Sequence, residues 1–352
     1  MHSRRKFLKN SLLGTAAVPF LLRKVPAEIL KHKVLIKPPA LKSGDTIGLI
    51  APASPLIESQ RTLIEATEKI EALGFRVKAG KNILSKRGYL AGTIAERVAD
   101  IHDMFSNPEI RAIMAISGGY GSAQLLPHLD YKRIQNNPKI LIGYSDITAL
   151  LNGIHRLTGL VTFHGPVAIS TFTDFTQKYF YRVLGENQAI GEIEDAPFED
   201  NLQTSNRIWA FRKGIGEGKL IGGNLTLLQA MMGTPYEIDT KDALLFFEEV
   251  DEAPYDLDRI LNQFKQAGKF DQCKGVLFDK LPSIKPYSRT AGFNNSLSVE
   301  EVIADIFDEY DFPVCIGFSL GHIKDKPTLP LGIRARLDAN TGRLSLLEAA
   351  VI

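Results

Sequence analysis

Short apolar runs alternate with amphipathic helical patterns over the first half of this chain, and this alternation constrains the fold more than any other feature. Residues 46–50 (TIGLI) and 111–116 (RAIMAI) have the composition of buried strands. Between them, residues 59–73 and 93–105 carry apolar side chains at helical spacing. Because strands that alternate with helices indicate a parallel sheet covered on both faces, the sequence predicts an α/β fold.

The chain of 352 residues is too long for one small core and divides most naturally into two domains. We predict an N-terminal α/β domain over residues 38–167, a connecting region over residues 168–215 and a C-terminal domain over residues 216–352. In the C-terminal domain we predict helices and strands in the following order: helix Leu225–Met232, strand Ala243–Phe247, helix Ile260–Ala267, and strands Lys274–Leu281 and Val314–Phe318.

The first thirty residues have the pattern of an export signal. Arg4 and Arg5 precede an apolar run at 11–22, as in twin-arginine signals. This run is too short to span a bilayer core, which needs about 20 residues. A basic amphipathic helix or a membrane anchor is the alternative interpretation. We predict a signal segment over residues 1–30, an exported, periplasmic protein, and no stable membrane insertion after export.

The distribution of charge argues against a nucleic-acid-binding protein. The chain has 42 Lys and Arg against 40 Asp and Glu, and six of these bases but no acid lie in residues 1–27, so the remainder is mildly acidic. No large basic surface is left for nucleic acid.

Cys273 and Cys315 are too few for a disulfide scaffold, and we predict buried free thiols, with a disulfide as the alternative. The sequence lacks zinc- and calcium-binding motifs, so we predict no metal and no cofactor.

A glycine-rich turn at residues 117–122 (SGGYGS) follows the predicted strand 111–116 and precedes a helical run. Its glycines permit a tight turn and close approach of a ligand to the backbone. Ser122 is predicted to lie beside free N–H groups at the start of the helix, where negative charge is stabilised. Gln124 prevents a match to either the G-x-S-x-G or the Rossmann spacing. The residues alone therefore leave three roles open: a nucleophile turn, an anion site, or a structural turn.

A serine of ordinary acidity needs a base, which is normally a histidine oriented by a carboxylate. Of seven histidines, His164 and His322 each stand at a predicted strand end beside a glycine, where the sites of open α/β sheets collect. Glu248 and Glu249 close the apolar run 243–247. A carboxylate there suits the orientation of a histidine, although a solvated charge is the commoner outcome at a strand exit.

Nine short motifs follow one another from about residue 40 to the end of the chain: IAPASP (50–55), GYLAGT (88–93), ISGGYGSAQLLPHLDY (116–131), LIGYSDITAL (141–150), TFHGP (162–166), GGNLTLLQAMMGTPYE (222–237), LFFEEV (245–250), PYDLDRIL (254–261) and GHIKDKPTLPLG (321–332). In this order and combination they resemble the LD-carboxypeptidase family of serine peptidases. The resemblance implies a flavodoxin-like parallel-sheet N-terminal domain, a smaller β-rich C-terminal domain, and a homodimer.

The same resemblance implies a catalytic triad of Ser122, Glu248 and His322, with Ser122 from the first domain and the other two from the second. In this scheme His322 takes the proton of Ser122, Ser122 attacks an L,D-peptide bond, and Glu248 orients the imidazole. The family's substrate is a muropeptide, from whose tetrapeptide stem a terminal D-Ala is released.

The backbone N–H groups of Gly118, Gly119 and Ala123 are the predicted donors to the oxyanion. Two alternatives remain from the sequence. One is a self-immunity peptidase of the same family, which inactivates peptide–nucleotide antibiotics, and the other is an inactive muropeptide-binding protein. Many family members recycle cell-wall peptides in the cytoplasm, and the predicted export signal argues against that role here.

Overall fold

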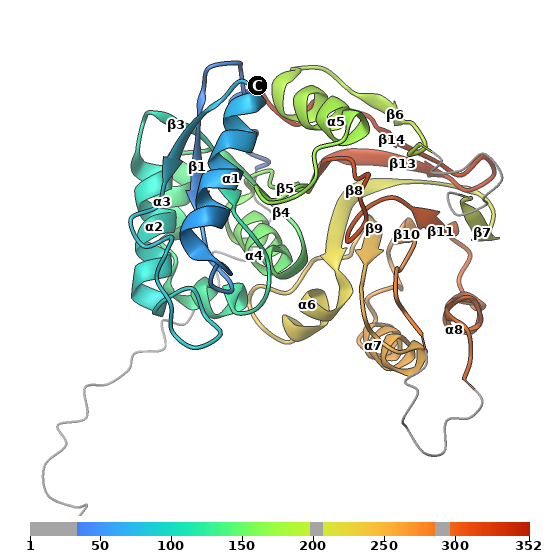
Figure 1. The fold of residues 1–352 in the computed structure, drawn as a ribbon. Helices are drawn as coiled ribbons and strands as arrows, with labels where there is room; N and C mark the ends of the chain where they lie inside the picture. The colour runs from blue at the N-terminus through green and yellow to red at the C-terminus, as the bar shows by residue number, and fades with distance from the viewer. Residues whose placement is uncertain (1–33, 198–206, 286–295) are drawn as a thin grey trace, which may run out of the picture.

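A computed structural model describes residues 34–197, 207–285 and 296–352, which form two β-sheets side by side with helices around them (Figure 1). The predicted signal segment 1–30 lies outside these residues. Within the described ranges, no helix combines the length and the apolar character that crossing a membrane requires. In the same ranges no group of three or more potential metal ligands was found.

The first sheet has six strands in the order β12-β5-β4-β3-β1-β2. Its strands are β1 (Thr46–Ile50), β2 (Arg76–Ala79), β3 (Ile110–Ala115), β4 (Ile140–Gly143), β5 (Phe163–His164) and β12 (Leu329–Pro330). The strands β1 to β5 pair in parallel, and only β12 runs antiparallel to its neighbour. This strand order is the flavodoxin-like order, so the predicted α/β architecture of the N-terminal half is confirmed.

The helices of this half follow the predicted β/α alternation: α1 (Ser59–Ala72), α2 (Ile94–Ser106), η2 (Ser122–His128), α3 (Tyr131–Asn136), η3 (Ser145–Ile147) and α4 (Thr148–Thr158). Thr93 caps α2 in a reciprocal capping box with Glu96, which satisfies amide groups at the start of that helix. The glycine-rich turn leads into η2, a 3-10 helix that contains Pro127. Pro127 has no amide hydrogen, so it cannot serve as a donor within a longer α-helix.

The second sheet has eight strands in the order β6-β14-β13-β8-β9-β10-β11-β7. Its strands are β6 (Gly191–Ile193), β7 (Trp209–Arg212), β8 (Ile215–Asn224), β9 (Ala243–Glu248), β10 (Gly275–Asp279), β11 (Val314–Phe318), β13 (Arg334–Asp338) and β14 (Arg343–Leu346). The four central strands β8 to β11 are parallel and the outer ones antiparallel. The second domain therefore has a mixed sheet.

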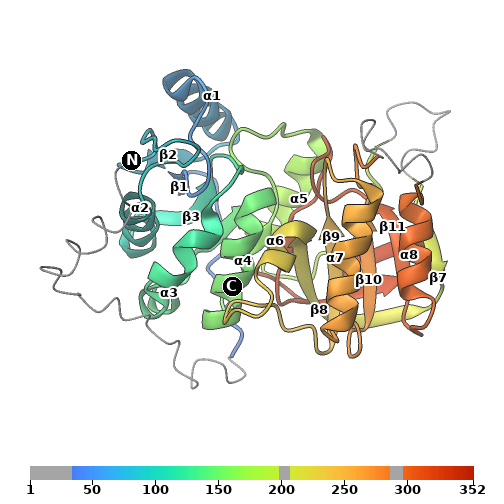
Figure 2. The ribbon, with the colours of Figure 1, turned by 90° about the horizontal axis from the view of Figure 1, so that it is seen from below.

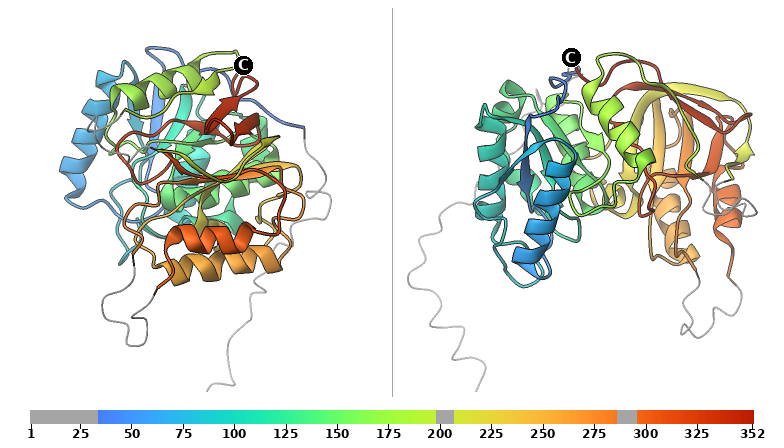
Figure 3. Two further views of the ribbon diagram at one scale, coloured as in Figure 1. Left: turned by 90° about the vertical axis from the view of Figure 1, so that its right-hand side faces the viewer. Right: turned by 45° about the horizontal axis from the view of Figure 1, so that its top comes forward.

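Four helices accompany the second sheet: α5 (Asp174–Gly185), α6 (Leu225–Ala230), α7 (Pro254–Gln266) and α8 (Val299–Phe307). Helices α7 and α8 lie side by side against one face of the sheet (Figures 2 and 3). The segment 168–215, predicted to connect the domains, also contributes the edge strands β6 and β7. Cys273 and Cys315 are buried and not disulfide-bonded.

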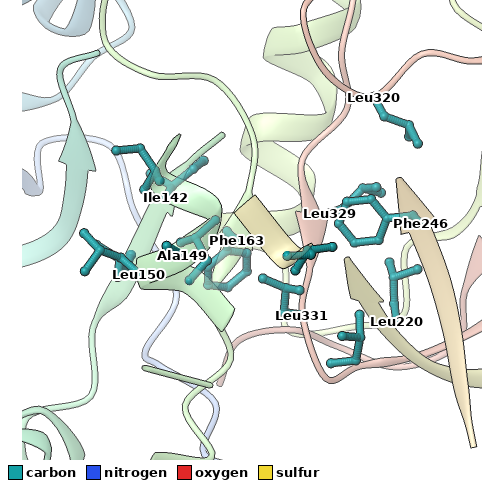
Figure 4. Close-up of a cluster of buried hydrophobic side chains, with 14 of the residues drawn as sticks. Ile142, Ala149, Leu150, Phe163, Leu220, Phe246, Leu320, Leu329 and Leu331 are labelled. Atoms are coloured by element: carbon teal, nitrogen blue, oxygen red, sulfur yellow. The ribbon is translucent and has the colours of Figure 1, made fainter. Parts of the chain in front are cut away.

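Side chains from both sheets meet in one hydrophobic cluster (Figure 4). Ile142 and Phe163 come from the first sheet, Leu220 and Phe246 come from the second, and all four are fully buried. Leu329 lies between them on β12, the strand that leaves the C-terminal half of the chain to pair with β5. Burying each of these side chains contributes about 1.5–3 kcal/mol, so the two domains are joined by a continuous core.

Candidate active site

The turn after β4 carries a serine in a strained backbone conformation. β4 ends at Gly143, and Ser145 then adopts φ 63°, in the left-handed region, at the start of η3. A residue other than glycine in this region costs about 1–3 kcal/mol and persists only where its surroundings hold it. The half-buried Ser145 thus stands on a sharp strand-to-helix turn at the carboxyl end of a parallel strand, which is where ligands bind in such sheets.

His322 connects this serine to a buried carboxylate. Its Nε2 lies 3.1 Å from Ser145 Oγ, and its Nδ1 lies 2.8 Å from Glu248 Oε2. Glu248 is the last residue of β9 and its side chain is fully buried, whereas the His322 side chain is 23 % exposed. With Nδ1–H donating to Glu248, Nε2 is left to accept the hydrogen of the Ser145 hydroxyl. These contacts form a hydroxyl–imidazole–carboxylate chain across the two domains.

The prediction that Ser122 supplies this hydroxyl was wrong, because the hydroxyl that contacts His322 is that of Ser145. Ser122 is fully buried, and its Oγ donates to the carbonyl oxygen of Asp146 at 2.5 Å. The amides of Gly121 and Ser122 donate to the two carboxylate oxygens of Asp146, at 3.2 and 2.8 Å. The glycine-rich turn therefore holds the residue that follows Ser145, and the Ser122 hydroxyl bonds to the Asp146 carbonyl, whereas His322 bonds to Ser145.

The predicted oxyanion donors sit differently with respect to Ser145. Gly118 faces it closely, since a Cβ atom at Gly118 would be 3.1 Å from Ser145 Cβ. A Cβ atom at Gly119 would be 2.4 Å from Ser54 Oγ. Ala123 was predicted as a donor because it follows Ser122. Since Ser145 and not Ser122 contacts His322, this reason no longer applies. A cavity of about 370 Å³ opens beside Gly118, and its lining includes Ser54 and Ile169.

The loop that carries His322 is fastened to the second sheet. Asp279, the last residue of β10, accepts the amide of Gly321 at 3.0 Å through Oδ2 and that of Leu281 at 2.7 Å through Oδ1. Burial raises the pKa of Asp279 to about 8, and the charge of Glu248 adds to the increase. Gly321 has no room for a side chain, because a Cβ atom there would lie 2.3 Å from Glu248 Oε2.

Two other candidates from the sequence lie nearby without joining this chain. Glu249 points to the other side of β9, where it accepts from Asn224 Nδ2 at 3.0 Å and from the amide of Thr226 at 2.8 Å, and so holds the start of α6. His164 is fully buried, and its Nε2 donates to the carbonyl of Leu320 at 3.0 Å. Glu249 thus fixes the start of α6, and His164 fixes the loop just before His322.

Sequence reasoning missed Ser145, Tyr144 and Asp279. Ser145 lies in the motif LIGYSDITAL (141–150), whose apolar run, glycine and serine before a helix carry the same strand–turn–helix signal as the turn at 117–122. The ring of Tyr144 packs edge-on against His322, with 5.1 Å between the ring centroids. Asp279 lies near the end of the predicted strand Lys274–Leu281, where an acidic residue is usually solvated.

Comparison with known families places the chain among the peptidases. The model of the LD-carboxypeptidase N-terminal domain matches residues 47–165, and that of the LD-carboxypeptidase C-terminal domain matches residues 217–337. The chain therefore belongs to the LD-carboxypeptidase family, as the sequence motifs predicted.

Individual relatives agree with this family. The chain is 39% identical over 315 residues to a probable murein peptide carboxypeptidase of Bacillus subtilis, covering 90% of this chain and 95% of that one. It is 32% identical to the microcin C7 self-immunity protein MccF of Escherichia coli, covering 91% and 97%. A solved structure of a protein of that name superposes with a TM-score of 0.81 at 29% identity, covering 90% and 100%. A muramoyltetrapeptide carboxypeptidase from Oxalobacter formigenes superposes with a TM-score of 0.72 at 27% identity, covering 86% and 97%.

The environment of His322 leads to a prediction about its pKa. Burial lowers this pKa, but the hydrogen bond and the negative charge of Glu248, together with the charges of Asp279 and Glu249, outweigh burial and leave it above the usual 6.5. In Glu248→Gln the charge is lost, so we expect the pKa of His322 to fall by about one unit or more. An NMR titration of the imidazole measures it.

The matched control for this titration is Glu249→Gln. Because Glu249 faces Asn224 and Thr226, we expect only a small decrease in the pKa of His322 there. An equal decrease in both variants, or no decrease in Glu248→Gln, contradicts the described geometry.

Proposed function

We propose that this protein is a serine LD-carboxypeptidase that releases the terminal D-amino acid, D-Ala, from the tetrapeptide stem of peptidoglycan. The observation that carries the proposal is the chain of hydrogen bonds from Ser145 through His322 to Glu248, at 3.1 and 2.8 Å. The family and the murein peptide carboxypeptidase among its relatives support a muropeptide as the substrate.

In the first step, His322 Nε2 takes the hydroxyl proton of Ser145 as Ser145 Oγ attacks the carbonyl carbon of the L,D-peptide bond. Glu248 accepts Nδ1–H throughout, which fixes the tautomer and stabilises the imidazolium. His322 must be neutral to act as a base. Because its pKa is raised, activity should increase with pH around a midpoint above the usual 6.5.

The negative oxygen of the tetrahedral intermediate needs hydrogen-bond donors. The amide that follows the nucleophile is that of Asp146, which lies in the first turn of η3 and has no acceptor within that helix. Gly118 of the glycine-rich turn is in close contact with Ser145, so its amide is the second donor that we propose. Each donor of this kind lowers the barrier by roughly 3 kcal/mol.

Collapse of the intermediate breaks the C–N bond, and the imidazolium of His322 gives its proton to the departing amine. The acyl group remains on Ser145 as an ester. A water molecule, deprotonated by His322, then attacks this ester, and the shortened stem peptide leaves while the Ser145 hydroxyl is restored.

The role of Ser145 is tested by replacing it and Ser122 separately. Because Ser145 is the proposed nucleophile, Ser145→Ala should lower kcat on a stem tetrapeptide by about 10⁴-fold or more. Ser122→Ala removes one hydrogen bond to the Asp146 carbonyl, which is worth about 1 kcal/mol, so kcat should fall by roughly fivefold. Mass spectrometry of the products from defined tri-, tetra- and pentapeptide stems measures both.

Thermal unfolding of both variants controls for loss of structure. The proposal fails if Ser145→Ala still trims the tetrapeptide, or if Ser122→Ala alone is inactive while folded.

A second candidate function is that of a self-immunity peptidase, which the 32% identity to MccF favours. An acyl-nucleotide assayed in parallel with the stem peptides distinguishes the two candidates. Cleavage of the acyl-nucleotide in preference to all stem peptides supports that candidate instead.

We propose further that the protein is exported to the periplasm by the twin-arginine-type segment at residues 1–30, where its substrate occurs outside the cytoplasm. The basis is the pair Arg4 and Arg5 ahead of the apolar run at 11–22. The homodimer implied by the family resemblance stays a prediction.

Export is tested with the full chain in a bacterial host that has the twin-arginine pathway. Replacing Arg4 and Arg5 together by Lys keeps the charge but removes the paired arginines that the pathway reads. We expect the protein in the periplasmic fraction for the wild type and in the cytoplasmic fraction for the variant, by immunoblot. Equal periplasmic amounts for both contradict the proposal.

A further inference from the structure

A carboxypeptidase must recognise the free carboxylate at the end of its substrate, which calls for a basic side chain. Two basic side chains near the glycine-rich turn are already occupied by backbone carbonyls. Arg97 Nη1 donates to Pro52 and Gly121 at 2.8 and 3.0 Å. Lys69 Nζ donates to the carbonyls of residues 169 and 170 at 3.0 and 2.8 Å. These bonds give both cations a role in holding backbone carbonyls, and the ammonium of Lys69 has one N–H left over.

Lys326 is a third basic side chain, and it reaches the other side of the site. It is only 3 % exposed, and its Nζ lies 5.2 Å from the centroid of the Tyr144 ring. That ring directly precedes Ser145 in the chain and packs edge-on against His322, with 5.1 Å between centroids. The ammonium of Lys326 and the imidazole of His322 thus both lie against the ring of Tyr144.

The ammonium of Lys326 has no hydrogen bond or ion pair with any residue in the three described ranges, although its backbone amide donates to Thr176 Oγ1. Asp325, next in the chain, uses its carboxylate to accept from Thr173. Burial lowers the pKa of Lys326 to about 8, although the negative charges of Asp325, Glu248 and Asp279 act to raise it. A buried cation without an anionic partner is costly, which points to a partner that arrives with the ligand.

A second unpaired group lies two residues further along the same segment. Thr328 Oγ1 is buried and lacks a hydrogen-bond partner among the described residues. It approaches Gly165, where a Cβ atom would be 3.0 Å from it. Gly165 follows His164, whose ring lies 6.3 Å from that of Tyr144. A hydroxyl is a suitable second donor for a carboxylate oxygen.

The chemistry of the leaving group fits this position. When Ser145 attacks the last peptide bond, His322 must reach the amide nitrogen of the terminal residue, and the terminal carboxylate is two covalent bonds beyond that nitrogen. We propose, on the basis of the proposed function, that Lys326 is the cation that binds the terminal carboxylate of the substrate. It thereby restricts the enzyme to peptides with a free C-terminal α-carboxylate.

The test compares two substrates, a stem tetrapeptide that ends in a free carboxylate and the same peptide with a C-terminal amide. The wild type should prefer the free acid by about 100-fold in kcat/KM, as expected for a buried charge pair. In Lys326→Met the value for the free acid should fall by about the same factor, whereas that for the amide should stay within about threefold. Lys326→Arg, which keeps the charge, should retain part of the preference.

The matched control is Lys324→Met, because Lys324 is an exposed lysine in the same loop and should leave both values unchanged. Three results overturn the proposal: a wild type that cleaves acid and amide equally, an equal loss on both substrates in a folded Lys326→Met, or no loss on either. The first needs no variant, so the test does not depend on the folding of Lys326→Met. A wild type that cleaves neither peptide overturns the proposed function itself, and the role of Lys326 with it.

Discussion

The hydrogen bond between Ser145 Oγ and His322 Nε2 joins residues 177 positions apart in the chain, one from each domain. It can form only if the two domains keep a fixed relative position to within a fraction of an ångström. The hydrophobic cluster of Figure 4 and the pairing of β12 with β5 provide that position. Because close-packed interiors resist small displacements, the core between the sheets is as necessary to the site as the polar side chains.

The conformation of Ser145 depends on a second set of contacts within the first domain. Its left-handed backbone is held by Asp146, which accepts the amides of Gly121 and Ser122 and receives the Ser122 hydroxyl on its carbonyl. The turn of three glycines is therefore a support for the serine beside it. Two of its glycines are explained by the need for close approach, Gly118 to Ser145 and Gly119 to Ser54.

Much of the fold could be predicted from the sequence, because the alternation of apolar strands and amphipathic helices is a local pattern. Glu248 and His322 could be found as well, since each follows a strand within a recognisable motif. The serine could not be chosen correctly, because 117–122 and 141–146 are both glycine–serine turns after a buried strand. Which hydroxyl faces His322 depends on the backbone angle at Ser145 and on the packing of two domains, and neither is a local property.

Lys326 and Asp279 could not be predicted for a related reason. In the sequence each is an ordinary charged residue near the end of a strand or in a polar loop, where solvent exposure is the usual outcome. Both are buried, and the segment 319–328 contacts both domains: Gly321 donates to Asp279, and Lys326 lies against Tyr144. Their altered pKa values are thus consequences of the domain arrangement.

The most direct measurement of the central claim is to locate the acyl group during turnover. Enzyme and stem tetrapeptide are quenched in acid, digested with trypsin and analysed by mass spectrometry; cleavage after Lys132, Arg133 and Lys139 separates the two serines. We predict that the fragment that contains Ser145 gains the mass of the acyl group, which is that of the shortened stem peptide less one water. The same mass on the fragment that contains Ser122 would contradict the assignment.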